Sequence, residues 1–352
     1  MHMQRKRKIP FILILLFSVV AILSLVGCSS QSSSESDTTK SASTKADSEY
    51  PIKIKHALGE TIIESKPKRV VTIQWGNQDV ALAPGVVPVG FSAANFGVQD
   101  DSGLLPWTAE KLEELDAKEP NVFQDTDGLD FEAISDANPD VILAAYSGIT
   151  QEDYDTLSEI APVVAYPKAP WATTWREQVE FNATGMGMKE EGEQLIKDTE
   201  DMIQEKLNKY PQIKGKKVVW VNFSAKDLSK LHIYTPIDSR AAFLEELGME
   251  YPKSVTELIK DPNNFYLELS TENVEALYDA DIIVGYGDDH LLKTIQKDPL
   301  LGKIPAVKRG SVAFIESDTP LVAAGTPTPL SIDYTIDDYL ELLGKAVDRI
   351  NE

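Results

Sequence analysis

Residues 69–75, RVVTIQW, form a continuous apolar run between a Lys-Pro-Lys turn and Gly76. A short apolar run bounded by turn residues is typical of a strand buried on both faces, as in a parallel sheet. Similar runs follow at VPVGF (87–91), VILAA (141–145) and PVVAY (162–166), with helical segments between them. Strands that alternate with helices predict an α/β lobe built on a parallel sheet.

The alternation of strand-like and helical segments stops after this first lobe and then resumes. Residues 172–210 have helical periodicity, interrupted near Gly185-Met186-Gly187. Strand-like runs return at KVVWVNF (217–223), LHIY (231–234), DIIVGY (281–286) and SVAFI (311–315), followed by an amphipathic helix at 333–349. The pattern predicts an α/β fold of two lobes, each a mainly parallel sheet flanked by helices, joined by one long interlobe α-helix. We expect the N-terminal lobe at 50–170, the interlobe helix at 171–189 and the C-terminal lobe at 190–352.

The first residues resemble an export signal. Four basic residues (5–8) precede an uncharged apolar run (9–26), and Leu25-Val26-Gly27-Cys28 matches the bacterial lipobox. This predicts a lipoprotein signal peptide at 1–27, lipidation of Cys28 and a Ser-rich flexible tether at 28–49. The chain would then be anchored to the outer face of the bacterial cytoplasmic membrane. An uncleaved transmembrane helix is the alternative, because the apolar run could span a bilayer.

Composition excludes several classes of protein. The 352 residues include 56 Asp or Glu, 34 Lys or Arg and one Cys, for a formal net charge of −22. A disulfide scaffold or a Cys-based metal site needs several thiols, and a nucleic-acid binder needs a basic face. The sequence therefore predicts no nucleic-acid partner.

Aromatic residues end or follow six successive strands. They are Trp75, Phe91, Tyr146, Phe223, Tyr234 and Tyr286. Ligands of open parallel sheets bind outside the carboxyl ends of the strands, so these rings are candidates for a cleft lining. Trp171, Trp175 and Arg176 lie where the chain crosses between the lobes, and Trp175 and Arg176 are further candidates. For each ring, packing in the core is the alternative, and Phe91 and Phe223 are the ones we expect there.

Catalytic motifs are weak. There is no G-x-S-x-G, phosphate loop or H-E-x-x-H. Gly285–His290 has acids and an imidazole, but a strand-to-helix turn with an Asp cap is favoured over a metal site. The sequence thus offers no strong catalytic or metal-binding motif.

Several segments together resemble one family. They are RVVTIQWGNQDVALAPGVVPVGF (69–91), FEAISDANPDVILAAYSG (131–148), DADIIVGY (279–286) and PTPLSIDYTIDDYLELLGKA (327–346). The pattern is similar to class III substrate-binding proteins of ABC importers, and most to iron–siderophore lipoproteins. The resemblance implies a monomer with two lobes bridged by one stiff helix. It would hold a ferric siderophore in its cleft, with the iron bound by the siderophore alone, and deliver it unchanged to an ABC permease and its ATPase. The resemblance thus implies a binding protein and not an enzyme, with no cofactor and no metal ligands of its own.

The resemblance also implies roles for individual residues. Trp75, Tyr146 and Tyr234 fall where the family has cleft aromatics, and Arg176 or Arg240 could donate to iron-bound oxygens. A surface salt bridge is an equal alternative for either arginine.

One acidic residue per lobe would dock on the permease. In the C-terminal lobe this is Glu245. In the N-terminal lobe it is Glu113, with Glu110 and Glu114 as competitors.

The charge of the cleft narrows the ligand class. The candidate cleft segments offer few basic residues, namely Arg176, Arg240, Lys168 and Lys226. Burial of an anionic ferric catecholate without paired cations is costly, so a neutral hydroxamate chelate is favoured over a catecholate or a carboxylate one. Cobalamin or haem binding on the same fold stays an alternative, as does a lipid-anchored enzyme or adhesin.

Overall fold

The computed structural model describes residues 50–97, 100–125, 127–224, 226–317 and 319–351, all within one compact unit, 47–352. The predicted signal peptide, Cys28 and the tether lie outside the described residues. Within the described part of the chain, no helix has the length and apolar character needed to cross a membrane.

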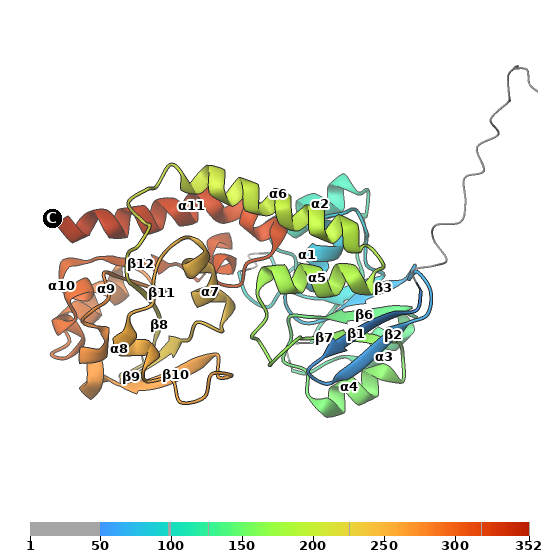
Figure 1. The fold of residues 1–352 in the computed structure, drawn as a ribbon, viewed down its shortest axis with the longest axis horizontal. Helices are drawn as coiled ribbons and strands as arrows, with labels where there is room; N and C mark the ends of the chain where they lie inside the picture. Colours follow the sequence, from blue (N-terminus) through green and yellow to red (C-terminus); the bar gives the residue numbers. More distant parts are fainter. Residues whose placement is uncertain (1–49, 98–99, 126, 225, 318, 352) are drawn as a thin grey trace, which may run out of the picture. The chain divides into compact units, whose positions relative to one another are not determined.

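The N-terminal lobe has a five-stranded, fully parallel sheet in the order β5-β4-β3-β6-β7 (Figure 1). Its strands are β3 (Val70–Thr72), β4 (Gly90–Ser92), β5 (Val122–Phe123), β6 (Val141–Ala144) and β7 (Val163–Ala165). The helices are α1 (Asn77–Leu82), α2 (Pro106–Glu114), α3 (Phe131–Asp136), α4 (Gln151–Ser158) and α5 (Trp175–Gly185). An antiparallel hairpin of β1 (Ile52–His56) and β2 (Gly59–Ile63) precedes them. Strands β3, β6 and β7 are buried along their whole length, as their apolar runs predict.

The C-terminal lobe has a second five-stranded sheet, in the order β10-β9-β8-β11-β12. Its strands are β8 (Val218–Ser224), β9 (Asp227–Tyr234), β10 (Tyr266–Ser270), β11 (Ile282–Tyr286) and β12 (Val312–Ile315). The helices are α7 (Ser239–Glu246), α8 (Lys253–Thr256), α9 (Asp289–Lys297) and α10 (Pro305–Arg309), with 3-10 turns η1 (Thr271–Leu277), η2 (Leu301–Lys303), η3 (Pro320–Gly325) and η4 (Arg349–Asn351).

This second sheet is mixed, which corrects the prediction of a mainly parallel one. Strand β11 pairs in parallel with β8 and β12, but β9 runs antiparallel to both β8 and β10. Only residues 225–226 join β8 to β9. A crossover between parallel strands needs a dozen or more residues. A connection of two residues can therefore only make an antiparallel hairpin.

The predicted interlobe helix at 171–189 is also corrected. That range holds α5, which packs on α1, β1, β6 and β7 within the N-terminal lobe, and the break after it. Gly187 ends this first helix at a φ of 65°, a left-handed conformation that glycine adopts without steric cost. The long helix that leads to the C-terminal lobe is α6 (Lys189–Leu207).

A second long helix, α11 (Pro329–Asp348), packs along α6 (Figure 1). It contacts α1 and α2 of the N-terminal lobe as well as β11 and β12 of the C-terminal lobe. One hydrophobic cluster includes Val80, Trp175 and Val179 together with the core of the C-terminal lobe. Two long helices that pack together, α6 and α11, therefore join the lobes, and side chains of the N-terminal lobe extend the core of the C-terminal lobe.

Candidate functional site

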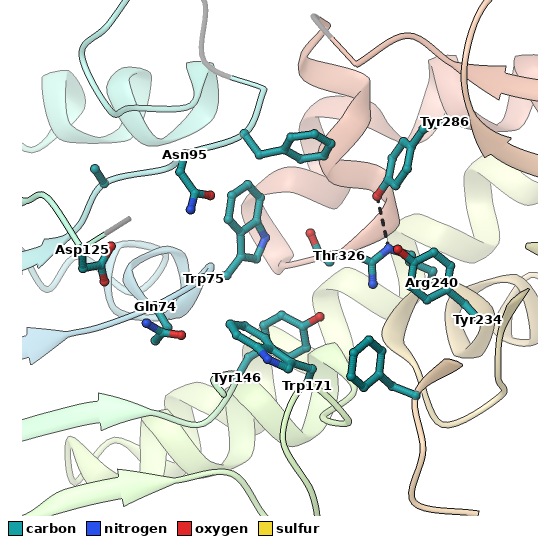
Figure 2. A pocket seen from close by; sticks show the side chains of 13 residues that line it. Gln74, Trp75, Asn95, Asp125, Tyr146, Trp171, Tyr234, Arg240, Tyr286 and Thr326 are labelled. Atoms are coloured by element: carbon teal, nitrogen blue, oxygen red, sulfur yellow. Dashed lines mark hydrogen bonds between the residues drawn. The ribbon is translucent and has the colours of Figure 1, made fainter. Parts of the chain in front are cut away.

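A cavity of about 470 Å³ lies between the lobes and is lined by residues of both. Figure 2 shows its side chains pointing toward one another from the two sides. Seven of the lining residues carry aromatic rings: Trp75, Phe96, Tyr146, Trp171, Tyr234, Phe265 and Tyr286. Among the described residues, Arg240 is the one lining cation and Asp125 the one lining carboxylate.

A buried amide network holds the N-terminal wall. The side chain of Asn77, the first residue of α1, donates to the carbonyl of Tyr146 at 2.9 Å and accepts from the Tyr146 N–H at 3.1 Å. Gln178 of α5 donates to the carbonyl of Trp75 at 3.2 Å and to the Asn77 Oδ1 at 3.2 Å. Asn77 is fully buried. Two neutral side chains, Asn77 and Gln178, therefore set the backbone positions from which the Tyr146 and Trp75 rings project.

A buried ion pair holds the C-terminal wall. Asp238 caps the start of α7, and its carboxylate accepts from Arg240 Nη1 at 2.9 and 3.1 Å. Arg240 Nε donates to the Tyr286 hydroxyl at 3.2 Å, and the guanidinium lies 4.3 Å from the centre of the Tyr234 ring. Burial raises the pKa of Asp238, while the charge of Arg240 opposes that shift. The positive charge of Arg240 at the cavity is thus already balanced by the Asp238 carboxylate.

The two walls meet at the edges of the cavity. The Tyr146 hydroxyl lies 3.2 Å from the Ser239 Oγ of α7, and the Phe96 and Tyr286 rings are 5.5 Å apart. Burial raises the pKa of Tyr146 to about 12. This phenol therefore stays protonated at neutral pH and can donate a hydrogen bond to a ligand oxygen.

The structure brings five predicted site residues together at the cavity: Trp75, Tyr146, Tyr234, Arg240 and Tyr286. Phe91 and Phe223 are buried in the two cores, as expected.

Trp175 and Arg176 do not reach this cavity. Trp175 is 1% exposed, belongs to the core between the lobes and donates its Nε1–H to Glu246 at 2.8 Å. Arg176 pairs with Glu246 and Glu200, at 2.6 Å each, and lies over the Trp175 ring. Arg176 therefore forms salt bridges, the alternative to ligand binding, because the first turn of α5 faces α6 and α7 and not the cleft.

Several lining residues were missed by the sequence pattern. Phe96, Phe265, Gln74, Asn95, Asp125 and Thr326 lie in loops or at strand exits without an aromatic periodicity. Trp171 could have been favoured over Trp175, since it lies outside the helical pattern. Its φ of 59° turns the chain so that its ring packs against Tyr146, with ring centres 5.4 Å apart.

The predicted docking carboxylates lie on two different helices. Glu113 is exposed on α2 and Glu245 is exposed on α7, and neither forms an ion pair with a described residue. Of the competitors, Glu114 pairs with Lys111 at 2.8 Å and Glu110 is exposed.

A second cavity, of about 680 Å³, lies within the C-terminal lobe next to Asp288, His290 and Glu316. Asp288 caps α9 by accepting from the Leu291 N–H at 2.7 Å, as the favoured alternative at Gly285–His290 predicts. In the described ranges, no group of three or more His, Cys, Asp or Glu side chains is arranged to hold a metal ion. The interlobe cavity, with rings from both lobes, is thus the candidate site.

Known proteins share this architecture. PiaA of Streptococcus pneumoniae in complex with ferrichrome is 54% identical, with a TM-score of 0.82 over 85% of this chain and 99% of that one. SirA of Staphylococcus aureus with staphyloferrin B is 25% identical, with a TM-score of 0.62 over 85% and 98%. The probable siderophore-binding lipoprotein YfiY of Bacillus subtilis is 27% identical over 75% of this chain and 74% of its own.

These likenesses confirm the predicted class of fold, two α/β lobes of the class III type. The relatives are named as binding proteins and not as enzymes. A family model described as periplasmic binding protein matches residues 70–319, which is most of the chain. The chain therefore belongs to the periplasmic binding protein family.

Proposed function

We propose that this chain captures a ferric hydroxamate siderophore in the interlobe cavity and delivers it to the permease of an ABC importer. The observation that carries the proposal is the cavity itself, in which seven rings surround an arginine whose charge is balanced by Asp238. The 54% identity with a protein seen in complex with ferrichrome, a hydroxamate chelate, supports the same ligand class.

Charge separates the candidate ligands. A ferric tris-catecholate carries about three negative charges, and its burial needs several unpaired cations. Here it would meet the Asp125 carboxylate and an arginine already paired with Asp238. Lys168, considered from the sequence, pairs with Glu177 at 2.7 Å outside the cavity. A neutral hydroxamate complex avoids this cost, and Arg240 and Tyr146 can donate to its iron-bound oxygens.

Titration of intrinsic tryptophan fluorescence tests the ligand class, because Trp75 and Trp171 line the cavity. Ferrichrome should quench the fluorescence saturably, whereas a ferric tris-catecholate should not. The iron-free hydroxamate controls for the role of the metal. Tight binding of the catecholate alone would overturn the hydroxamate assignment. Binding of cobalamin or haem alone would overturn the siderophore assignment. Haem has little support, since no histidine of the described residues lines this cavity.

Delivery requires an anchor and a docking face. In this proposal the lipidated Cys28 holds the monomer at the membrane, and Glu113 and Glu245 contact arginines of the permease, which works with its ATPase. Glu113→Ala and Glu245→Ala should leave ferrichrome affinity unchanged and reduce uptake of radioactive iron by cells. Glu110→Ala and Glu114→Ala are the matched comparisons on α2. Normal uptake with both Glu113 and Glu245 replaced would contradict the docking assignment.

A further inference from the structure

The two ends of the interlobe cavity differ in charge. Figure 2 shows Asp125, Gln74 and Asn95 at one end, Arg240 with two tyrosines at the other, and Trp75 between them. Arg240 is balanced by the fully buried Asp238, so its end of the cavity is close to neutral overall. At the opposite end, the Asp125 carboxylate has no such counter-charge, because the other polar side chains there are uncharged amides.

The carboxylate of Asp125 is held in place without a cation. The Ser92 hydroxyl donates to Asp125 Oδ2 at 2.5 Å, and the Ser92 Oγ in turn accepts from the backbone N–H of Gln74 at 2.7 Å. Gln74 has a φ of 62°, in the left-handed region that non-glycine residues rarely adopt. Such strain persists only where surrounding contacts enforce it, and it is often found at ligand sites. In the described part of the chain, no Lys, Arg or His pairs with Asp125.

A half-buried carboxylate that has only neutral donors is poorly stabilised in its charged form. Burial raises the pKa of Asp125, and the bond from Ser92 only partly offsets that shift. A cation at this end of the cavity would complete the pair through a charge-assisted hydrogen bond. The lining cation Arg240 is paired with Asp238 at the other end, and no described residue beside Asp125 is a cation, so the ligand would supply the charge.

We propose that Asp125 forms a subsite for a positively charged substituent, so that the cavity prefers ferric hydroxamates carrying a primary ammonium group to their neutral counterparts. The proposal rests on the proposed function and deepens it. The neutral iron–hydroxamate centre lies among the rings and Arg240, while the ammonium group reaches the carboxylate at the opposite end. The acidic chain, with a formal net charge of −22, also favours the approach of a cationic chelate.

Two chelates that differ in one charge test the subsite. Ferrioxamine B is a linear ferric trihydroxamate that ends in a primary ammonium group, and acetylation of its amine removes the charge. Calorimetric titration of the full chain should give about tenfold tighter binding of the charged form, the gain expected from one charge-assisted hydrogen bond. Asp125→Asn should remove this preference, so that the charged and the acetylated forms bind the variant with equal affinity.

Asp127→Asn is the matched control, because Asp127 is an exposed carboxylate two residues away that does not line the cavity. It should keep the tenfold preference. Equal affinity of the unaltered chain for both chelates, with ferrichrome still bound, would overturn the subsite and leave the proposed function standing. A preference that survives Asp125→Asn would also overturn it. If no hydroxamate chelate binds, the proposed function and the subsite fail together.

Discussion

The two walls of the cavity are held by different physical means. On the N-terminal side, Asn77 and Gln178 fix the backbone of Trp75 and Tyr146 through neutral hydrogen bonds. On the C-terminal side, the Asp238–Arg240 pair holds the guanidinium beside two tyrosines. Loss of one partner leaves an unpaired amide in the first wall but an unpaired buried charge in the second. The C-terminal wall should therefore be the more sensitive to a single substitution.

The core beneath both walls should give the largest effect. Trp175→Ala removes a large side chain that is 1% exposed, and it should lower the free energy of unfolding by about 3–5 kcal/mol. Trp75→Ala should cost less than about 1 kcal/mol but weaken ferrichrome binding, because this ring borders the cavity. Urea unfolding and fluorescence titration measure the two properties. Similar loss of stability in both variants would show that Trp75 is also a core residue.

A substitution in the C-terminal wall should give the next largest loss of stability. Arg240→Ala leaves the fully buried Asp238 without its partner and should destabilise the chain by about 3 kcal/mol. Arg240→Lys keeps a positive charge, so its loss of stability should be less than half that of Arg240→Ala. Protonation of Asp238 relieves the unpaired charge, so the cost of Arg240→Ala should shrink as the pH falls. Equal stability of the alanine variant and the unaltered chain at neutral pH would contradict the ion-pair account.

Substitutions in the N-terminal wall should lower the free energy of unfolding less than those in the C-terminal wall. Asn77→Ala leaves the buried N–H of Tyr146 without a partner and should cost about 2 kcal/mol. Affinity for ferrichrome should also fall, because Tyr146 loses the side chain that positions it, and Gln178, which holds the Trp75 carbonyl, loses its acceptor on Asn77. Asn182→Ala removes only one donor to Asn77 and serves as the comparison. If the two variants bind ferrichrome equally well, Asn77 has no positioning role.

Much of the fold could be predicted from the sequence, because buried strands and amphipathic helices have regular apolar periods. Tyr146 and Tyr286 were found because the carboxyl ends of parallel strands meet at one edge of a sheet. Partners distant in sequence have no such local signal, as with Asn77 and Gln178, which are 101 residues apart. Asp125 was missed for the same reason.

Trp175 shows a second limit. Its aromatic character and its place at a helix start were visible in the sequence. The Thr174–Glu177 capping box fixes where α5 begins, but the sequence does not show which neighbour the first turn faces. The structure shows that this turn faces Glu246 of α7.

The smallest predicted effect concerns a second buried carboxylate. Asp79 of α1 is 1% exposed and accepts from Trp107, Thr108 and Thr328, with no cation among the described residues. Burial raises the pKa of Asp79 above its unfolded value, against the effect of these bonds. Its contribution to stability is therefore full below the unfolded pKa and falls as the pH rises through the folded one.

Melting temperatures of the unaltered chain and of Asp79→Asn between pH 4 and pH 7 test this sign. The advantage of the unaltered chain should shrink as the pH rises. A growing advantage would mean that the three donors outweigh burial at Asp79.

The location of the iron is the most direct test of the capture site. Crystals of the chain grown with ferrichrome should give one anomalous peak at the iron edge, inside the interlobe cavity between Trp75 and Arg240. A peak in the C-terminal cavity beside His290 and Glu316, or no peak between the lobes, would contradict the account.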